Sequence, residues 1–474
     1  MEFKFRRRSR EGGKRVWCSR SGSGKERAPA DSMRHINHFP QAFIVTLAGA
    51  RSLSSQQLKL MDRLPPSRLR FSLHPFAILF LITCIQLTTL AQAESGAPRV
   101  FLIKANDLIT TRERIKSGDK KTEAALSKLR LDAEKALNSG PFSVTSKTVT
   151  PPSGDKRDYM SQAPYFWPDP KSSTGLPYIR RDGERNPEID KIDNHRVLDQ
   201  MQAAVETLSL AYFFTHEEKY AAKATELLRT FFLNTPTRMN PNLEYAQGIP
   251  GINTGRGIGL IETRGLTRVV DAIGLLRGAK TWSEADQRGL ENWFDQFLRW
   301  MLESKNGKDE SAAKNNHGTY YDVQVVSFAL FLGQRELARK VLETAKQKRI
   351  ALQIEPDGRQ PLELTRTKAW SYSVGNLDGL TLLARLGESV DVDLWNYETR
   401  DGRSIRKAIN FLTPFAFGEK KWPYQQLGEW PPQMLFPLLR RASEKYADPQ
   451  IVTTVSKLPA VETTDRRNLL FGVR

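Results

Sequence analysis

Amphipathic helices dominate the hydrophobic pattern of this chain from about residue 196 onward. Apolar residues recur there every three or four positions, which is the spacing of one buried helix face, and no comparable stretch alternates as a half-buried strand does. The helices are expected at 197–214, Tyr220–Phe232, Ile261–Leu276, Ser283–Leu302, Val323–Leu332, Glu336–Ile350, Leu377–Leu386 and Gln433–Tyr446. Ser283-Glu-Ala-Asp is an N-cap signature that opens its helix. The pattern predicts an all-α fold in which helical hairpins stack around a common axis.

Two long loops interrupt the helices. Residues 159–187 are rich in proline and aromatic residues, and residues 240–262 include the glycine-rich run Gly255-Arg-Gly-Ile-Gly. Long loops in a compact body are more often functional than idle, so both are candidate parts of a binding site. The glycine-rich run follows no predicted strand and matches no Rossmann or Walker pattern, which excludes it as a nucleotide signal.

The N-terminal part of the chain has the three features of a secretory signal. Arginines follow Met61, a short apolar run begins at Pro75, and Ala91-Gln-Ala93 ends the segment. We therefore expect residues 1–60 to be a mistaken upstream start or a disordered extension, and 61–93 to be a signal peptide. A single exported domain, 94–474, is expected to follow, periplasmic or secreted and without stable membrane insertion. A buried helix at 75–90 is the alternative interpretation.

Charge and composition narrow the function further. The whole chain carries a formal charge of +19, but residues 1–93 hold 16 of the 72 Lys and Arg and only 5 of the 53 Asp and Glu. The remaining body is only mildly basic, which disfavours a nucleic-acid partner. Both cysteines precede residue 94, and only three histidines follow it, so neither a thiolate site nor a multi-histidine metal centre is expected.

The densest polar cluster of the body is Lys314-Asn-Asn-His-Gly-Thr-Tyr-Tyr-Asp322, at the entrance to an apolar run. In the simplest interpretation Asn315 or Asn316 caps a helix and His317 is an ordinary surface or core histidine. A functional interpretation needs partners, which Glu363-Leu-Thr-Arg-Thr-Lys-Ala-Trp-Ser-Tyr372 supplies. On one continuous helix Arg366 and Tyr372 would face different ways, so both reach one site only if the backbone breaks between them or the site wraps around the helix end. Otherwise, Arg366 pairs with Glu363 at the surface and Tyr372 lies in the core.

Three segments together resemble the alginate-lyase superfamily of polysaccharide lyases, in particular its branch that cleaves alginate or β-1,4-glucuronan. They are Asn315-Asn-His, the loop Tyr165-Phe-Trp-Pro-Asp-Pro, and Glu363-Leu-x-Arg followed by Tyr372; the similarity extends from about residue 157 to 440. The resemblance implies an α/α toroid, an incomplete or closed barrel of helical hairpins, with long loops over an open groove. The spacing of six between Arg366 and Tyr372 is one short of that in mannuronate-specific members, so their substrate preference does not carry over.

The reaction implied by this resemblance is β-elimination in a 1,4-linked uronate polymer. The C5 proton becomes removable when donors neutralise the adjacent carboxylate, and Asn316, His317 and Arg366 are expected to do so. Tyr372, with its pKa lowered by a nearby cation, is expected to take the proton and return it to the departing O4. For a C5 epimer such as guluronate, His317 on the opposite face is the better base. No metal or organic cofactor is required.

The expected partner is therefore an anionic polysaccharide, and Tyr165, Trp167, Arg256 and Asn315 are expected to contact it. Two other functions remain open. A glycoside hydrolase on a similar toroid would use two carboxyl groups, from among Asp169, Glu262, Asp322 and Glu363, although none has a diagnostic spacing. A non-catalytic carbohydrate-binding protein of the envelope would explain the helices and the export signal. The oligomeric state is not indicated by the sequence.

Overall fold

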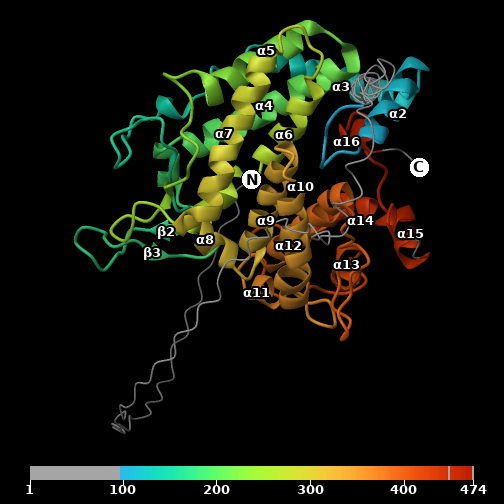
Figure 1. The fold of residues 1–474 in the computed structure, drawn as a ribbon. Helices are drawn as coiled ribbons and strands as arrows, with labels where there is room; N and C mark the ends of the chain where they lie inside the picture. The colour runs from blue at the N-terminus through green and yellow to red at the C-terminus, as the bar shows by residue number, and fades with distance from the viewer. Residues whose placement is uncertain (1–96, 447–448, 472–474) are drawn as a thin grey trace, which may run out of the picture. The chain divides into compact units, whose positions relative to one another are not determined.

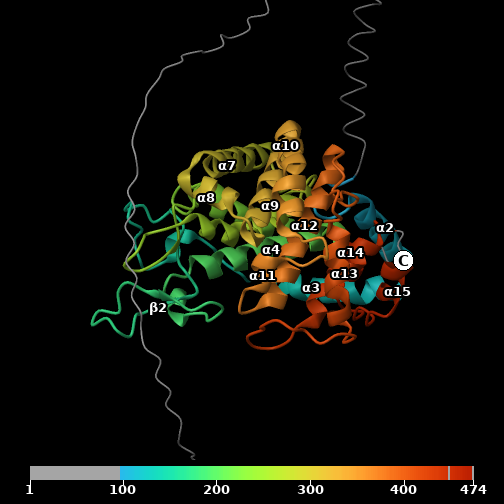
Figure 2. The same cartoon turned by 90° about the horizontal axis from the view of Figure 1, so that it is seen from below.

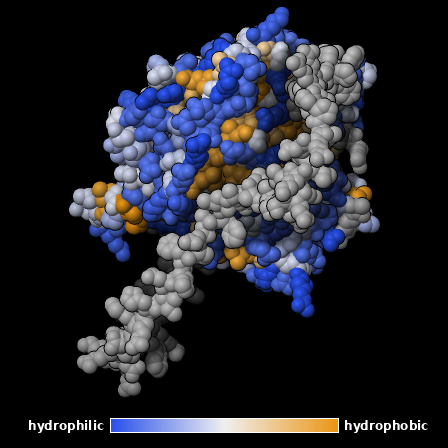
Figure 3. Space-filling model, viewed as in Figure 1, coloured by the Kyte–Doolittle hydropathy of each residue, from blue (hydrophilic) through white to orange (hydrophobic). Residues whose placement is uncertain are grey.

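The computed structural model describes residues 97–446 and 449–471. The expected N-terminal extension and signal peptide lie outside the described residues. In the described part most residues are helical, and none of its helices is both long enough and apolar enough to cross a membrane. Figure 3 shows a mostly hydrophilic surface with hydrophobic residues gathered in a few patches.

Four inner helices form the centre of the array (Figure 1). Each contacts the next in the order α4 (Asn194–Thr215), α6 (Leu266–Leu275), α9 (Asn316–Phe331) and α12 (Ala369–Gly387). Three of them, α4, α9 and α12, are also labelled in the turned view of Figure 2. They are buried on most sides: in α9, all but two of the 16 residues are buried. A helix that is covered all round needs apolar or paired polar residues on every face, and this one carries both.

Outer helices pack against the inner ones and bury one face each. They are α3 (Lys120–Leu137), α5 (Glu218–Leu228), α7 (Glu284–Glu303), α10 (Arg335–Ala345), α13 (Ile405–Ala416) and α14 (Phe436–Ser443). The predicted cap of α7 is confirmed, because Ser283 and Asp286 form a reciprocal capping box. Inner and outer helices together make an α/α toroid, as the sequence predicts.

Shorter helices complete the array and include the largest departures from the sequence prediction. They are α2 (Ala105–Lys116), α8 (Lys305–Ala312), α11 (Pro361–Leu364), α15 (Pro449–Ser456) and α16 (Arg467–Leu470). The helical body begins with α2 and α3, well before residue 196. The hydrophobic pattern of α3 is weak because half of its six buried residues are small alanines. Helices α9 and α12 also begin earlier than expected. The first turn of α9 buries the polar Asn316 and Thr319, and that of α12 buries Ala369 and Trp370 beside the partly exposed polar residues Ser371 and Tyr372.

The two long loops contain all four short strands of the described residues. Strand β1 (Met160–Gln162) pairs in parallel with β4 (Tyr245–Gly248), which ties the first loop to the second. Strand β2 (Phe166–Trp167) pairs antiparallel with β3 (Ile179–Arg180) to form a hairpin at one end of the helical array (Figure 1). The loops are thus hydrogen-bonded to each other beside the start of α9.

Candidate active site

A groove of about 1030 Å³ lies between these loops and the first turns of α9 and α12. Seven of the eight residues that the sequence singles out line it: Tyr165, Arg256, Asn315, Asn316, His317, Arg366 and Tyr372. The eighth, Trp167, is not among the lining residues. Its indole N–H donates to the Glu184 carbonyl, and the Arg181 guanidinium lies 5.2 Å from its ring centroid. The Trp167 side chain therefore makes its contacts with residues of its own loop rather than with the groove.

A break between two helices brings Arg366 and Tyr372 together. Helix α11 ends at Leu364, α12 begins at Ala369, and residues 425–427 hydrogen-bond to the backbone of the intervening link. The Arg366 Cζ atom consequently lies 3.7 Å from the centroid of the Tyr372 ring. The interruption is one of the two arrangements that the six-residue spacing allows for both side chains to reach one site.

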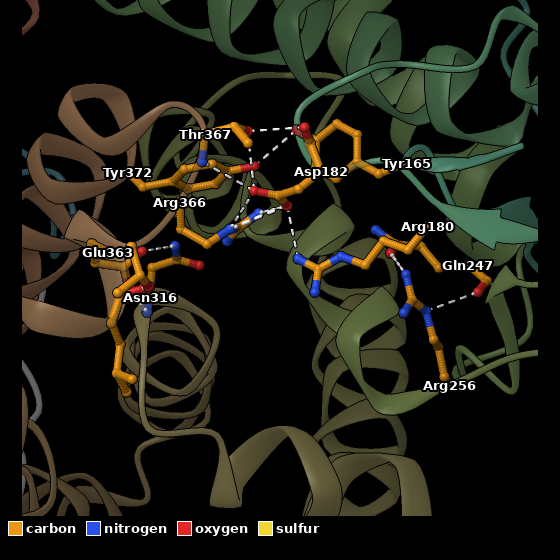
Figure 4. A network of polar contacts seen from close by, with 12 residues as sticks. Tyr165, Arg180, Asp182, Gln247, Arg256, Asn316, Glu363, Arg366, Thr367 and Tyr372 are labelled. Atoms are coloured by element: carbon orange, nitrogen blue, oxygen red, sulfur yellow. Dashed lines mark hydrogen bonds and ion pairs between the residues drawn. The ribbon is translucent and has the colours of Figure 1, made fainter. Parts of the chain in front are cut away.

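Arg366 is bound by a carboxylate that the sequence did not single out. Its Nε and Nη2 donate to Asp182 at the end of the β2–β3 hairpin, with the Nη2–Oδ1 distance 2.9 Å (Figure 4). Burial opposes ionisation of Asp182, but hydrogen bonds from Arg366 and Thr367 hold its pKa well below the usual value. The alternative expectation, a surface pair of Arg366 with Glu363, is wrong because Glu363 is buried and binds elsewhere.

The Tyr372 hydroxyl donates to the Tyr165 hydroxyl at 2.9 Å, so the first loop contributes directly to the surroundings of α12 (Figure 4). Burial raises the pKa of Tyr372, and the bond with Tyr165 raises it further, while Arg366 acts in the opposite direction. Arg366 thus lowers the pKa of Tyr372 as expected, but burial and Tyr165 outweigh it, so the expectation of a pKa below the usual value is wrong for this structure. The neighbouring guanidinium is already paired with Asp182, and burial disfavours the phenolate.

Glu363 holds the start of α9. Its carboxylate accepts the Asn316 backbone N–H at 2.6 Å and the Asn316 side-chain amide at 2.9 Å. Burial raises the pKa of Glu363, whereas these two hydrogen bonds and the positive charges of Arg366 and His317 lower it. A carboxylate at a helix N-terminus satisfies free N–H groups there, so the side chains of Asn315 and Asn316 do not cap α9 as the simplest interpretation expected.

His317 lies in the same first turn and has a buried partner. Its Nδ1 is 2.7 Å from Oε1 of Glu310, a residue of α8 that is 1% exposed. An ionised carboxylate only accepts hydrogen bonds, so this contact places the proton on Nδ1 and leaves Nε2 available to a ligand. No sequence signal identified Glu310, because the contact depends on how α8 packs against α9.

Arg256 lines the groove from the second loop. It donates to the Gln247 side chain at 2.9 Å (Figure 4). Its guanidinium lies 5.1 Å from the Phe166 ring centroid. Of the four carboxylates considered for a hydrolase, Glu262 alone lines the groove, where it accepts from Tyr159 and Ser161. Asp322 is paired with buried Arg349. No two of these candidates are thus arranged across the groove.

Comparisons with known proteins agree with this geometry. The family model described as alginate lyase matches residues 143–422. An alginate lyase from Bacteroides ovatus is 40% identical, with a TM-score of 0.76 over 79% of this chain and 99% of its own. A histidine-to-alanine variant of alginate lyase A1-III, solved with a tetrasaccharide, is 16% identical, with a TM-score of 0.50 over 75% of this chain and 91% of its own, which shows the fold alone. No curated protein sequence matches significantly.

Proposed function

This chain belongs to the alginate lyase family of polysaccharide lyases, and we propose that it cleaves 1,4-linked uronate chains, alginate or glucuronan, by β-elimination. The observation that carries the proposal is the convergence of Tyr372, Asn316, His317 and Arg366 on one groove. The charge of the groove supports it too, since seven arginines and lysines line it against four aspartates and glutamates. An excess of positive charge attracts and orients a polyanionic substrate.

Neutralisation of the substrate carboxylate is the first requirement of the reaction. Glu363 takes one Asn316 amide N–H, which leaves the second amide N–H to donate to the substrate carboxylate. Glu310 holds His317 Nδ1–H, so Nε2 donates to that carboxylate only when the imidazole carries a proton on both nitrogens. Arg366 donates to Asp182 through Nε and Nη2, so its Nη1 side is the part that serves a substrate. Preorganised donors of this kind stabilise the enolate-like charge that develops when the C5 proton leaves.

Tyr372 is the proposed base and then the acid that protonates the departing O4. Because burial raises the pKa of Tyr372, its phenolate is a minor form at neutral pH. As long as the pH is below that pKa, each increase of one pH unit raises the phenolate fraction about tenfold. The contact with Tyr165 assists this step, since the Tyr165 hydroxyl can turn and donate to the Tyr372 phenolate. Where the proton and the leaving oxygen share one face, a single hydroxyl performs both transfers.

The test is product formation from matched polymers. The full chain is incubated with mannuronate blocks, guluronate blocks, glucuronan and a carboxyl-reduced form of the best substrate, and ultraviolet absorbance of unsaturated uronate ends is followed. We expect absorbance to rise with at least one free uronate and not with the reduced polymer, which lacks the acidified C5 proton. Chain cleavage without unsaturated ends would contradict elimination and favour hydrolysis.

A further inference from the structure

Asp182 accepts more hydrogen bonds than a simple ion pair with Arg366 would provide. Besides both contacts from Arg366, its carboxylate accepts the Thr367 backbone N–H at 3.2 Å and the Thr367 hydroxyl at 3.0 Å, and its carbonyl accepts the same hydroxyl at 2.9 Å. Arg180 adds a fourth donor group at 2.7 Å. The next residue is Gly183 with φ +78°, and a Cβ there would lie 2.4 Å from the Thr367 hydroxyl. Only glycine lets the hairpin approach this closely.

These contacts fix both the position and the charge of Arg366. A guanidinium bound along one edge by a carboxylate has a defined plane, and this one lies over the Tyr372 ring. The carboxylate also balances the positive charge that would otherwise stand beside the Tyr372 hydroxyl. Asp182 itself is not among the residues that line the groove, so it acts on the site through Arg366.

We propose that Asp182 is a positioning residue of the elimination reaction, which fixes Arg366 against Tyr372 and balances its charge, and so sets the strength of Tyr372 as a base. This inference rests on the proposed function of the groove. It differs from the expectation of a free arginine at the site, because the arginine and its carboxylate partner work as a unit. The pair supplies directed N–H groups with little net charge.

The charged groups around Tyr372 have opposing effects on its pKa, as expected if Asp182 balances the charge of Arg366. Burial is the largest cause of its raised pKa, the bond with Tyr165 follows, and Arg366 and Asp182 then act in opposite directions. Titratable and charged groups come to this part of the molecule from every neighbouring segment: Tyr165, Arg180 and Asp182 from the first loop, Arg366 and Lys368 from the helix link, Glu363 from α11, His317 from α9, Glu310 from α8 and Asp378 from α12.

The decisive experiment compares kcat and kcat/KM against pH for the full chain and for Asp182→Asn, which keeps the size of the side chain and removes its charge. An unbalanced Arg366 favours the Tyr372 phenolate, so the acid limb of kcat/KM should move to lower pH by about half a unit or more, a roughly threefold gain on that side. KM for the anionic polymer should also fall. Asp182→Glu keeps the charge and should keep the wild-type limb, although kcat should fall as the guanidinium shifts.

Asp357→Asn is the matched control, since Asp357 forms an exposed pair with Arg359 away from the groove. Its profile should coincide with the wild type. An unshifted limb in a folded Asp182→Asn variant, or an equal loss of kcat at every pH, would overturn the positioning role while leaving the lyase function intact. If Asp182→Asn does not fold, a shifted limb in Asp182→Glu would overturn it instead, and an unshifted limb with lower kcat would support it. A wild-type chain that forms no unsaturated product would refute the proposed function itself.

Discussion

Replacing Glu310 by Gln should lower activity without lowering stability. Glu310 is 1% exposed, its Oε1 lies 2.7 Å from His317 Nδ1, and its Oε2 has no hydrogen-bond partner among the described residues. The substitution keeps the shape of the side chain but removes the charge that orients the imidazole.

The size of the effect follows from the contact. A hydrogen bond to a charged group contributes about 1.5–3 kcal/mol and a neutral one about 0.5–1.5 kcal/mol. The substitution therefore weakens the hydrogen bond that orients His317 by about 1–1.5 kcal/mol. If His317 acts in the transition state, kcat should fall about tenfold. The free energy of unfolding should stay the same or rise, because a buried carboxylate with one unpaired oxygen carries a desolvation cost that the amide largely avoids.

The assay combines initial rates of unsaturated-product formation with urea unfolding, for the wild type, Glu310→Gln and Glu303→Gln. Glu303 is an exposed carboxylate at the end of α7 and serves as the matched control. Full activity in Glu310→Gln would show that His317 needs no orienting partner. A loss of stability as large as the loss of activity would mean that Glu310 supports the fold rather than the reaction.

Three further results are expected. Asp322→Asn should cost about 3–5 kcal/mol of unfolding free energy in urea titrations, because it leaves Arg349 buried without its counter-charge; a cost below about 1 kcal/mol would contradict this. Burial raises the pKa of Asp271, which accepts N–H groups from 101–103, from 3.8 to about 7. The folded state then holds its proton more tightly, so stability should fall as pH rises through that window, and Asp271→Asn should flatten the profile. The raised pKa of Tyr372 predicts that kcat/KM increases from neutral to alkaline pH, and an optimum below neutrality would contradict it.

The sequence predicted the helical layers well where only one face of a helix is buried. The outer helices α7 and α10 follow their apolar stripes and start within a residue of the expected position. The inner helices follow a different rule, since α9 and α12 are covered on most sides and their first turns carry polar residues bound to other segments. Periodicity detects a contrast between two faces, and these turns have none.

The sequence identified most residues that line the groove, but not the carboxylates that bind two of them. The motifs led to Asn316, His317 and Tyr372, and the six-residue spacing predicted either a helix break or a site around the helix end, of which the structure has the break. Asp182 lies 184 positions from Arg366, and Glu310 contacts His317 only through the packing of α8 on α9. The direction of the Tyr372 pKa was wrong for the same reason, since burial and charge balance depend on these distant partners.

Tyr372→Phe tests the central claim most directly. Rates of unsaturated-product formation are measured on mannuronate blocks, guluronate blocks and glucuronan for the wild type, Tyr372→Phe and Tyr397→Phe, a control tyrosine outside the groove. Removal of one hydroxyl should leave the unfolding transition of Tyr372→Phe close to that of the wild type, while its rate falls at least about a hundredfold on the polymers that the wild type cleaves. A folded Tyr372→Phe variant with near-normal rates on all of those polymers would contradict the assignment of Tyr372 as base and acid.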